Sequence, residues 1–146
     1  MRTVRSLLLA GALALLLPVV ANADSSGPGF RMPSGLVTCA ILDHSGGPRA
    51  LHCGATYITK RAYDGVGVVA LPPGRKARIV GSGNDVLLLL GGYEPDGKPR
   101  RWPRPTLRYG TTWTKNGYTC RSRQTGLTCR SGRHGFFLSK ERQRYF

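Results

Sequence analysis

Acidic residues are scarce in this chain. Of its 146 residues, 7 are Asp or Glu and 22 are Lys or Arg, which gives a formal net charge of +15. The few acids are scattered and mostly in turn contexts, so nothing indicates the placed carboxylate pair that glycoside cleavage needs. A basic surplus of this size favours anionic partners: an anionic polymer, an acidic lipid surface or an acidic protein. A GC-rich genome alone would also produce an arginine-rich chain.

Metal, cofactor and nucleic-acid motifs are missing too. His44, His52 and His134 form no ligand pattern with the cysteines, and no Cys-x-x-Cys occurs, so we expect no metal. No complete glycine-rich dinucleotide motif is found either, and we expect no cofactor. The chain has no recognition module and no interleaved aromatic–basic pattern, so we expect no specific nucleic-acid recognition.

No nucleophile motif stands out. His134, Ser139 and Glu141 could be combined into a catalytic set, but no Gly-x-Ser-x-Gly elbow surrounds the serine. We therefore assign no catalytic residue.

The long apolar run of the chain lies at the N-terminus. Arg2 and Arg5 precede an apolar stretch from Leu7 to Leu17, and Ala21-Asn22-Ala23 follows. This order is that of a secretory signal peptide, and the stretch is shorter than the roughly 20 residues of a membrane span. We expect residues 1–23 to be cleaved and the mature chain, with a net charge of +13, to be secreted into the extracellular space or cell envelope. The most apolar mature run, Val86 to Leu90, is too short for a transmembrane segment and is predicted to be a buried strand.

Four cysteines remain: Cys39, Cys53, Cys120 and Cys129. An even number in an exported chain predicts two disulfides. Cys39 and Cys53 flank the turn Ser45-Gly46-Gly47-Pro48 symmetrically, which predicts a hairpin with its own cross-strand disulfide.

Short strands separated by Gly/Pro turns predict an all-β fold, either an antiparallel sandwich or a small barrel stapled by disulfides. Residues 24–29 are expected to be a flexible lead, and residues 30–146 a single β domain. The predicted strands are Leu36–Leu42, Ala50–Thr59, Val66–Leu71, Ala77–Val80, Val86–Leu90, Thr106–Tyr109, Thr111–Lys115, Tyr118–Arg123, Leu127–Arg130 and Phe136–Leu138.

Two tight turns fix a register near the C-terminus. Asn116-Gly117 is typical of a two-residue type I′ hairpin, which places Trp113 opposite Cys120. If Gln124-Thr125 is the next two-residue loop, Cys120 lies directly opposite Cys129. Counting from the loops makes that pair a non-hydrogen-bonded one, whose side chains are closer and suit a disulfide.

Alternation then separates two faces. Trp113, Tyr118, Cys120, Ser122, Leu127 and Cys129 are predicted to face the core. The other face carries threonines and the arginines Arg121, Arg123 and Arg130, whose forked donors suit anionic oxygens. These three are the candidate anion-binding residues. An ordinary solvated outer face is the competing interpretation.

Both ends of the mature chain carry signatures: Phe30-x-x-Pro33-Ser34-Gly35-x-Val37-x-Cys39, then Cys53; and Leu107-x-Tyr109-Gly110, Cys120-x-Ser122, Gly126-x-Thr128-Cys129, His134-Gly135-Phe136, Ser139-Lys140 and Arg144-x-Phe146. On these residues the chain resembles a family of small secreted domains of unknown function, common in actinobacteria. Leu36 and Arg133 depart from the family pattern, and its frequent middle cysteine pair is missing. The resemblance implies export, a β-rich fold and pairing of adjacent cysteines, but no chemistry.

The sequence therefore predicts a secreted, non-enzymatic binding domain with a basic Arg/Thr face. A small secreted hydrolase centred on His134 and a secreted enzyme inhibitor are the alternatives.

Overall fold

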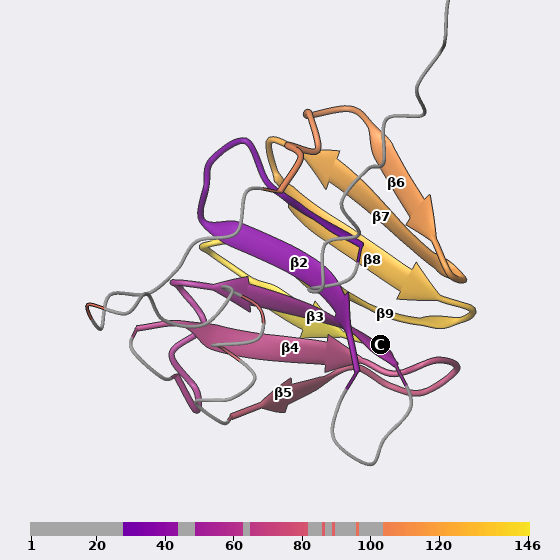
Figure 1. Ribbon diagram of the computed structural model, residues 1–146, viewed down its shortest axis with the longest axis horizontal. Helices are drawn as coiled ribbons and strands as arrows, with labels where there is room; N and C mark the ends of the chain where they lie inside the picture. Colours follow the sequence, from indigo (N-terminus) through magenta and orange to yellow (C-terminus); the bar gives the residue numbers. More distant parts are fainter. Residues whose placement is uncertain are drawn as a thin grey trace, which may run out of the picture.

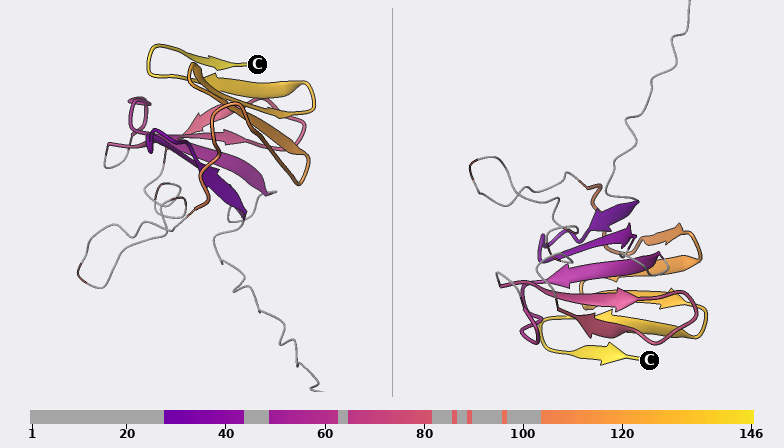
Figure 2. Two further views of the ribbon diagram at one scale, coloured as in Figure 1. Left: turned by 90° about the horizontal axis from the view of Figure 1, so that it is seen from above. Right: turned by 60° about the horizontal axis from the view of Figure 1, so that its bottom comes forward.

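The fold consists of two antiparallel sheets. The computed structural model describes residues 28–43, 49–62, 65–81, 86, 89, 96 and 104–146. Within these ranges, two five-stranded sheets are stacked as layers (Figures 1 and 2), which confirms the predicted all-β class and selects the sandwich over the small barrel. No helix in the described ranges is long and apolar enough to cross a membrane. The predicted signal peptide and residues 24–27 of the predicted lead lie outside the described residues.

The first sheet follows chain order. Its strands are β1 (Gly29–Arg31), β2 (Val37–Leu42), β3 (Ala50–Ala55), β4 (Gly67–Leu71) and β5 (Arg78–Val80). Four of these match predicted strands to within a few residues. The strand β1 was missed, because Gly29 had been placed in the flexible lead. Cys39 lies directly opposite Cys53, and the two form the predicted disulfide.

Both faces of the first sheet are covered. Every residue of β3 and β4 is buried, as expected of a central layer. One face packs on the second sheet, and the other contacts a small cluster that includes Val86 and Leu89. These two residues have helical conformation, so the strand predicted at Val86–Leu90 was wrong there. Periodicity cannot separate a short apolar run in a strand from one in a buried helix.

The second sheet is formed by the C-terminal third of the chain. Its strands are β6 (Thr112–Lys115), β7 (Tyr118–Arg123), β8 (Gly126–Ser131), β9 (His134–Leu138) and β10 (Gln143–Tyr145), in the order β10-β9-β8-β7-β6. In the β6–β7 turn, Asn116 and Gly117 have φ values of 49° and 81°, as a type I′ turn requires. The strand β10 was missed. Of the strand predicted at Thr106–Tyr109, the structure has one isolated bridge, between Arg31 and Thr106.

The predicted register of the second sheet is confirmed. Trp113 lies opposite Cys120, and Cys120 lies opposite Cys129. The disulfide Cys120–Cys129 joins Cα atoms 4.1 Å apart, close to the spacing of a non-hydrogen-bonded pair. The burial of β7 alternates strictly, with one face in the core and one exposed.

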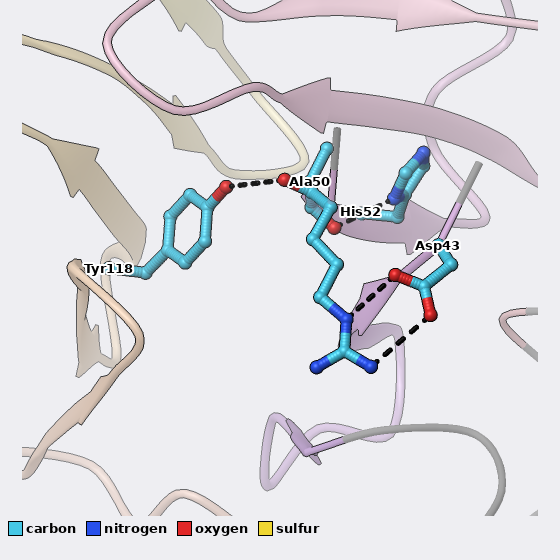
Figure 3. A network of polar contacts seen from close by, with 5 residues as sticks. Asp43, Ala50, His52 and Tyr118 are labelled. Carbon is cyan, nitrogen blue, oxygen red and sulfur yellow. Dashed lines mark hydrogen bonds and ion pairs between the residues drawn. The ribbon is translucent and has the colours of Figure 1, made fainter. Parts of the chain in front are cut away.

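The core between the sheets is the face predicted from alternation. Phe30 of β1 contacts Trp113 of β6, with ring centroids 5.1 Å apart. Tyr118 of β7 is buried, and its hydroxyl donates a hydrogen bond of 3.3 Å to the carbonyl of Arg49, the residue just before β3 (Figure 3). Beside it, the exposed Arg49 guanidinium binds both carboxylate oxygens of Asp43 and lowers the pKa of that carboxyl.

Candidate anion-binding face

The outer face is the side of the second sheet that is turned away from the first. Cross-strand pairing arranges its side chains in rows. One row runs from Arg121 of β7 through Thr128 of β8 and Phe137 of β9 to Arg144 of β10. A second row runs from Thr119 through Arg130 and Gly135 to Phe146, because Gly135 and Phe146 exchange backbone hydrogen bonds of 2.8 and 3.0 Å.

The three predicted arginines all lie on the exposed side of this sheet. Arg121 and Arg130 stand in adjacent rows on neighbouring strands. Arg123 ends β7 and lies at the border, where it lines a separate cleft at the end of the sandwich. The structure therefore groups two of the three on the outer face and places the third at its edge.

Sequence reasoning missed four further members of the face. Arg142 and Arg144 come from the β9–β10 segment, as do the aromatic rings of Phe137 and Phe146. Alternation from the buried Phe136 would have placed Phe137 outward. Arg144 and Phe146 are also two residues apart and so lie on one face of an extended segment. Because β10 was not predicted, nothing in the sequence indicated that they lie on the sheet.

Two glycines make room for the two aromatic rings. A methyl group on Gly135 would lie 3.0 Å from Cε2 and 3.1 Å from Cζ of Phe146. A methyl group on Gly126 would lie 2.7 and 2.8 Å from the ring of Phe137. Both rings therefore rest against glycine backbone, the arrangement by which an aromatic side chain covers a glycine in a sheet.

An arginine guanidinium group lies over each ring. The Arg130 Cζ lies 4.8 Å from the centroid of the Phe146 ring, and the Arg142 Cζ lies 5.6 Å from that of Phe137. Both distances are within the range of cation–π contact. The rings hold the two arginine heads over the sheet and so reduce the side-chain freedom that an exposed arginine would lose on binding.

These residues surround a shallow hollow of about 270 Å³. We call it the Arg–Phe hollow, and it is lined by Thr128, Arg130, Phe137, Arg142, Arg144 and Phe146. Within the described part of the chain, none of its three arginines has a carboxylate at ion-pair distance. Their donors are therefore available to an anion from outside, and the Thr128 hydroxyl adds a neutral donor.

The described residues do not bring together the His134–Ser139 catalytic pair or a metal site. His134 begins β9 and Ser139 follows its last residue, so five residues of nearly extended chain separate them by about 17 Å. His52 is buried in the first sheet, with its Nδ1 3.1 Å from the carbonyl oxygen of Ala50. Among the described residues, no group of three or more His, Cys, Asp or Glu gathers to hold a metal ion.

Comparison with known proteins concerns the same part of the chain. Residues 94–146 match a family of unknown function, DUF6636. No curated protein and no solved structure matches the chain. The DUF6636 match includes the whole second sheet with its Arg–Phe hollow, whereas the signature from Phe30 to Cys53 lies outside it.

Proposed function

We propose that this chain is a secreted, non-enzymatic domain that binds an anionic polymer of the cell envelope or extracellular space through the outer face of its second sheet. Export is supported by the order of Arg2, Arg5, the apolar stretch and Ala21-Asn22-Ala23, together with two disulfides, which persist in oxidising compartments.

The observation that carries the binding proposal is the Arg–Phe hollow. Arg130 and Arg142 are held over aromatic rings, and Arg144 completes a set of forked donors for which the described residues include no carboxylate partner. Guanidinium groups bind phosphate, sulfate and carboxylate oxygens with two parallel hydrogen bonds. An ordinary solvated face has no need to order its arginines in this way.

The spread of the arginines favours a polymer over a single small anion. Arg121 and Arg144 belong to one row but stand three strands apart, which is about 14 Å at normal strand spacing. One phosphate or sulfate group cannot reach both. A chain with repeated anionic groups can contact the hollow and Arg121 together, and the net charge of +13 that remains after removal of Arg2 and Arg5 attracts such a chain.

The alternatives receive less support. A hydrolase centred on His134 is not supported in the form that uses Ser139 as its nucleophile, because these two residues stand at opposite ends of β9. No described feature favours enzyme inhibition in particular. An acidic lipid surface or an acidic protein would also be attracted by the positive charge of the domain. Binding to acidic lipid vesicles distinguishes the lipid surface from the polymer.

The test compares two triple variants on immobilised dextran sulfate. The face variant carries Arg130→Gln, Arg142→Gln and Arg144→Gln. The control carries Arg75→Gln, Lys76→Gln and Arg78→Gln, which removes the same charge from exposed positions around the β4–β5 turn. Three exposed contacts are worth up to about 1 kcal/mol each, so we expect binding to weaken by about 1–3 kcal/mol in the face variant and clearly less in the control. Both variants must melt at the wild-type temperature.

Elution at the same salt concentration for both variants would contradict the proposal, because net charge alone would then explain retention. Retention of the wild type should fall steeply with salt, since exposed charges are screened over about 10 Å at 0.1 M. Tighter binding to vesicles of acidic lipid than to dextran sulfate would replace the polymer with a membrane surface as the partner.

A further inference from the structure

A second cavity lies at one end of the sandwich, away from the Arg–Phe hollow. Its volume is about 340 Å³, which is within the range of small-molecule sites. We call it the end cleft. Turns from both sheets meet there: the β1–β2 turn and Tyr57 from the first, and the β7–β8 and β9–β10 turns from the second.

The floor of the end cleft is apolar and its rim is polar. Met32, Val37 and Leu138 are buried and form part of the floor. The rim includes Gln124 and Thr125 of the β7–β8 turn. An apolar floor with a few convergent polar groups is the usual composition of a ligand site.

Charges of both signs stand on the rim. Glu141 and Lys140 come from the β9–β10 turn, and Arg123 comes from the start of the β7–β8 turn. In the described part of the chain, Glu141 has no ion-pair partner, although the protein is strongly basic. The two turns are about two strand spacings apart, so the acid and Arg123 are separated by roughly 10 Å along the rim.

Two tyrosines, Tyr57 and Tyr109, also line the end cleft. Burial first, and then the negative charge of Glu141, raises the pKa of Tyr57 to about 12. The phenol therefore keeps its proton at physiological pH and remains a hydrogen-bond donor. Tyr109 stands on the rim with 40% of its surface exposed, so it can cover a ligand without first leaving the core.

We propose that the end cleft binds a small zwitterion of the class of short peptides with free termini, with the ammonium group at Glu141 and the carboxylate at Arg123. A dipeptide spans about 7 Å, and a hydrogen bond at each end lets it reach across the separation of the two charges. Its apolar side chains would lie on the floor formed by Met32, Val37 and Leu138.

The mixed charges decide against simpler ligands. A plain anion would be attracted by Arg123 and Lys140 but repelled by the carboxylate of Glu141, and a plain cation would be attracted by Glu141 but repelled by the two bases. The end cleft shares no lining residue with the Arg–Phe hollow and carries charges of both signs, so its ligand is tested separately from the proposed polymer binding.

The test is a titration of the purified full chain with leucyl-alanine, followed by NMR. Parallel titrations use N-acetyl-leucyl-alanine, which lacks the ammonium group, and leucyl-alanine amide, which lacks the carboxylate. Glu141→Gln is the cleft variant. Asp43→Asn is its control, because it removes an exposed carboxylate outside the cleft, the one that pairs with Arg49.

We expect leucyl-alanine to bind and to shift the resonances of the β7–β8 and β9–β10 turns. Glu141→Gln should weaken this binding roughly fivefold, the upper value for an exposed ion pair, and Asp43→Asn should not. N-acetylation should weaken binding to the wild type by a similar factor and make it insensitive to Glu141→Gln. Loss of the ligand carboxylate should weaken it as well.

The proposal is overturned if leucyl-alanine causes no shifts up to millimolar concentrations, or if the free and acetylated dipeptides bind the wild type equally. The comparison of ligands on the wild type decides the question even if Glu141→Gln fails to fold. Equal weakening by Glu141→Gln and Asp43→Asn would also overturn it, since net charge would then be the cause.

Discussion

At the scale of single residues, the outer face depends on two glycines as much as on its arginines and aromatic rings. Gly126 and Gly135 leave space that the rings of Phe137 and Phe146 occupy, and the rings in turn support Arg142 and Arg130. The sequence showed the arginines of β7 and β8 through alternation. The sequence could not show the glycine–ring contacts, because a glycine in a predicted strand indicates only a weakened strand or a bulge.

Tyr57 provides a prediction for alkaline pH. Its pKa is about 12 in the folded protein, whereas the ordinary pKa of a tyrosine, which applies to the unfolded chain, is 10.0. Above pH 10 the unfolded state releases the proton more readily, so the free energy of unfolding should fall as pH rises from about 10 to about 12. Below this window the contribution is fully present.

The measurement is urea unfolding at a series of alkaline pH values for the wild type and for Tyr57→Phe. The variant should lose stability less steeply within the window, and the exposed Tyr109→Phe serves as its control. Identical pH dependence of all three proteins would show that the phenol of Tyr57 is not desolvated in the fold.

At the scale of elements, loop length decided how much could be predicted. The two-residue turns at 116–117 and 124–125 fix the registers of β6, β7 and β8 completely, and both were derived from the sequence. The short edge strands β1 and β10 were missed, because their three residues show no clear alternation, whereas the equally short β5 contains the β-branched pair Ile79 and Val80. Both strands form because a neighbouring strand pairs with them, and this pairing cannot be recognised from their own residues.

A substitution in β9 tests how the C-terminal segment rests on the sheet. Gly135→Ala would place a methyl group against the carbonyl oxygen of Cys129 and the ring of Phe146. Crowding of this kind costs about 1–3 kcal/mol, and we expect the free energy of unfolding to fall by that amount. Thr119→Ala, in the same row but exposed, should change it by less than about 0.5 kcal/mol.

Chemical denaturation of both variants measures these effects. Unchanged stability of Gly135→Ala would mean that the ring of Phe146 does not lie over this glycine. Crowding should also displace the ring that supports Arg130, so retention of the variant on dextran sulfate should decrease at temperatures where it is fully folded.

At the scale of the whole molecule, the two sheets have different environments. The first sheet is covered on one face by the second sheet and on the other by the cluster with Val86 and Leu89. The second sheet has one covered face, so its outer face is the broad sheet surface that the described part of the protein offers to a partner. The sequence predicted the alternation of β7 that produces this face, but not the helical residues that close the first sheet.

The most direct test of this account is to map where an anionic oligomer touches the protein. Addition of a short dextran sulfate oligosaccharide should shift the NMR resonances of the Arg–Phe hollow and of Arg121, and increasing salt should reverse the shifts. Residues 72–76 of the β4–β5 turn, which carry Arg75 and Lys76, should shift much less. Shifts spread evenly over all basic surfaces, or concentrated in that turn, would contradict the claim that the outer face of the second sheet is an anion-binding site.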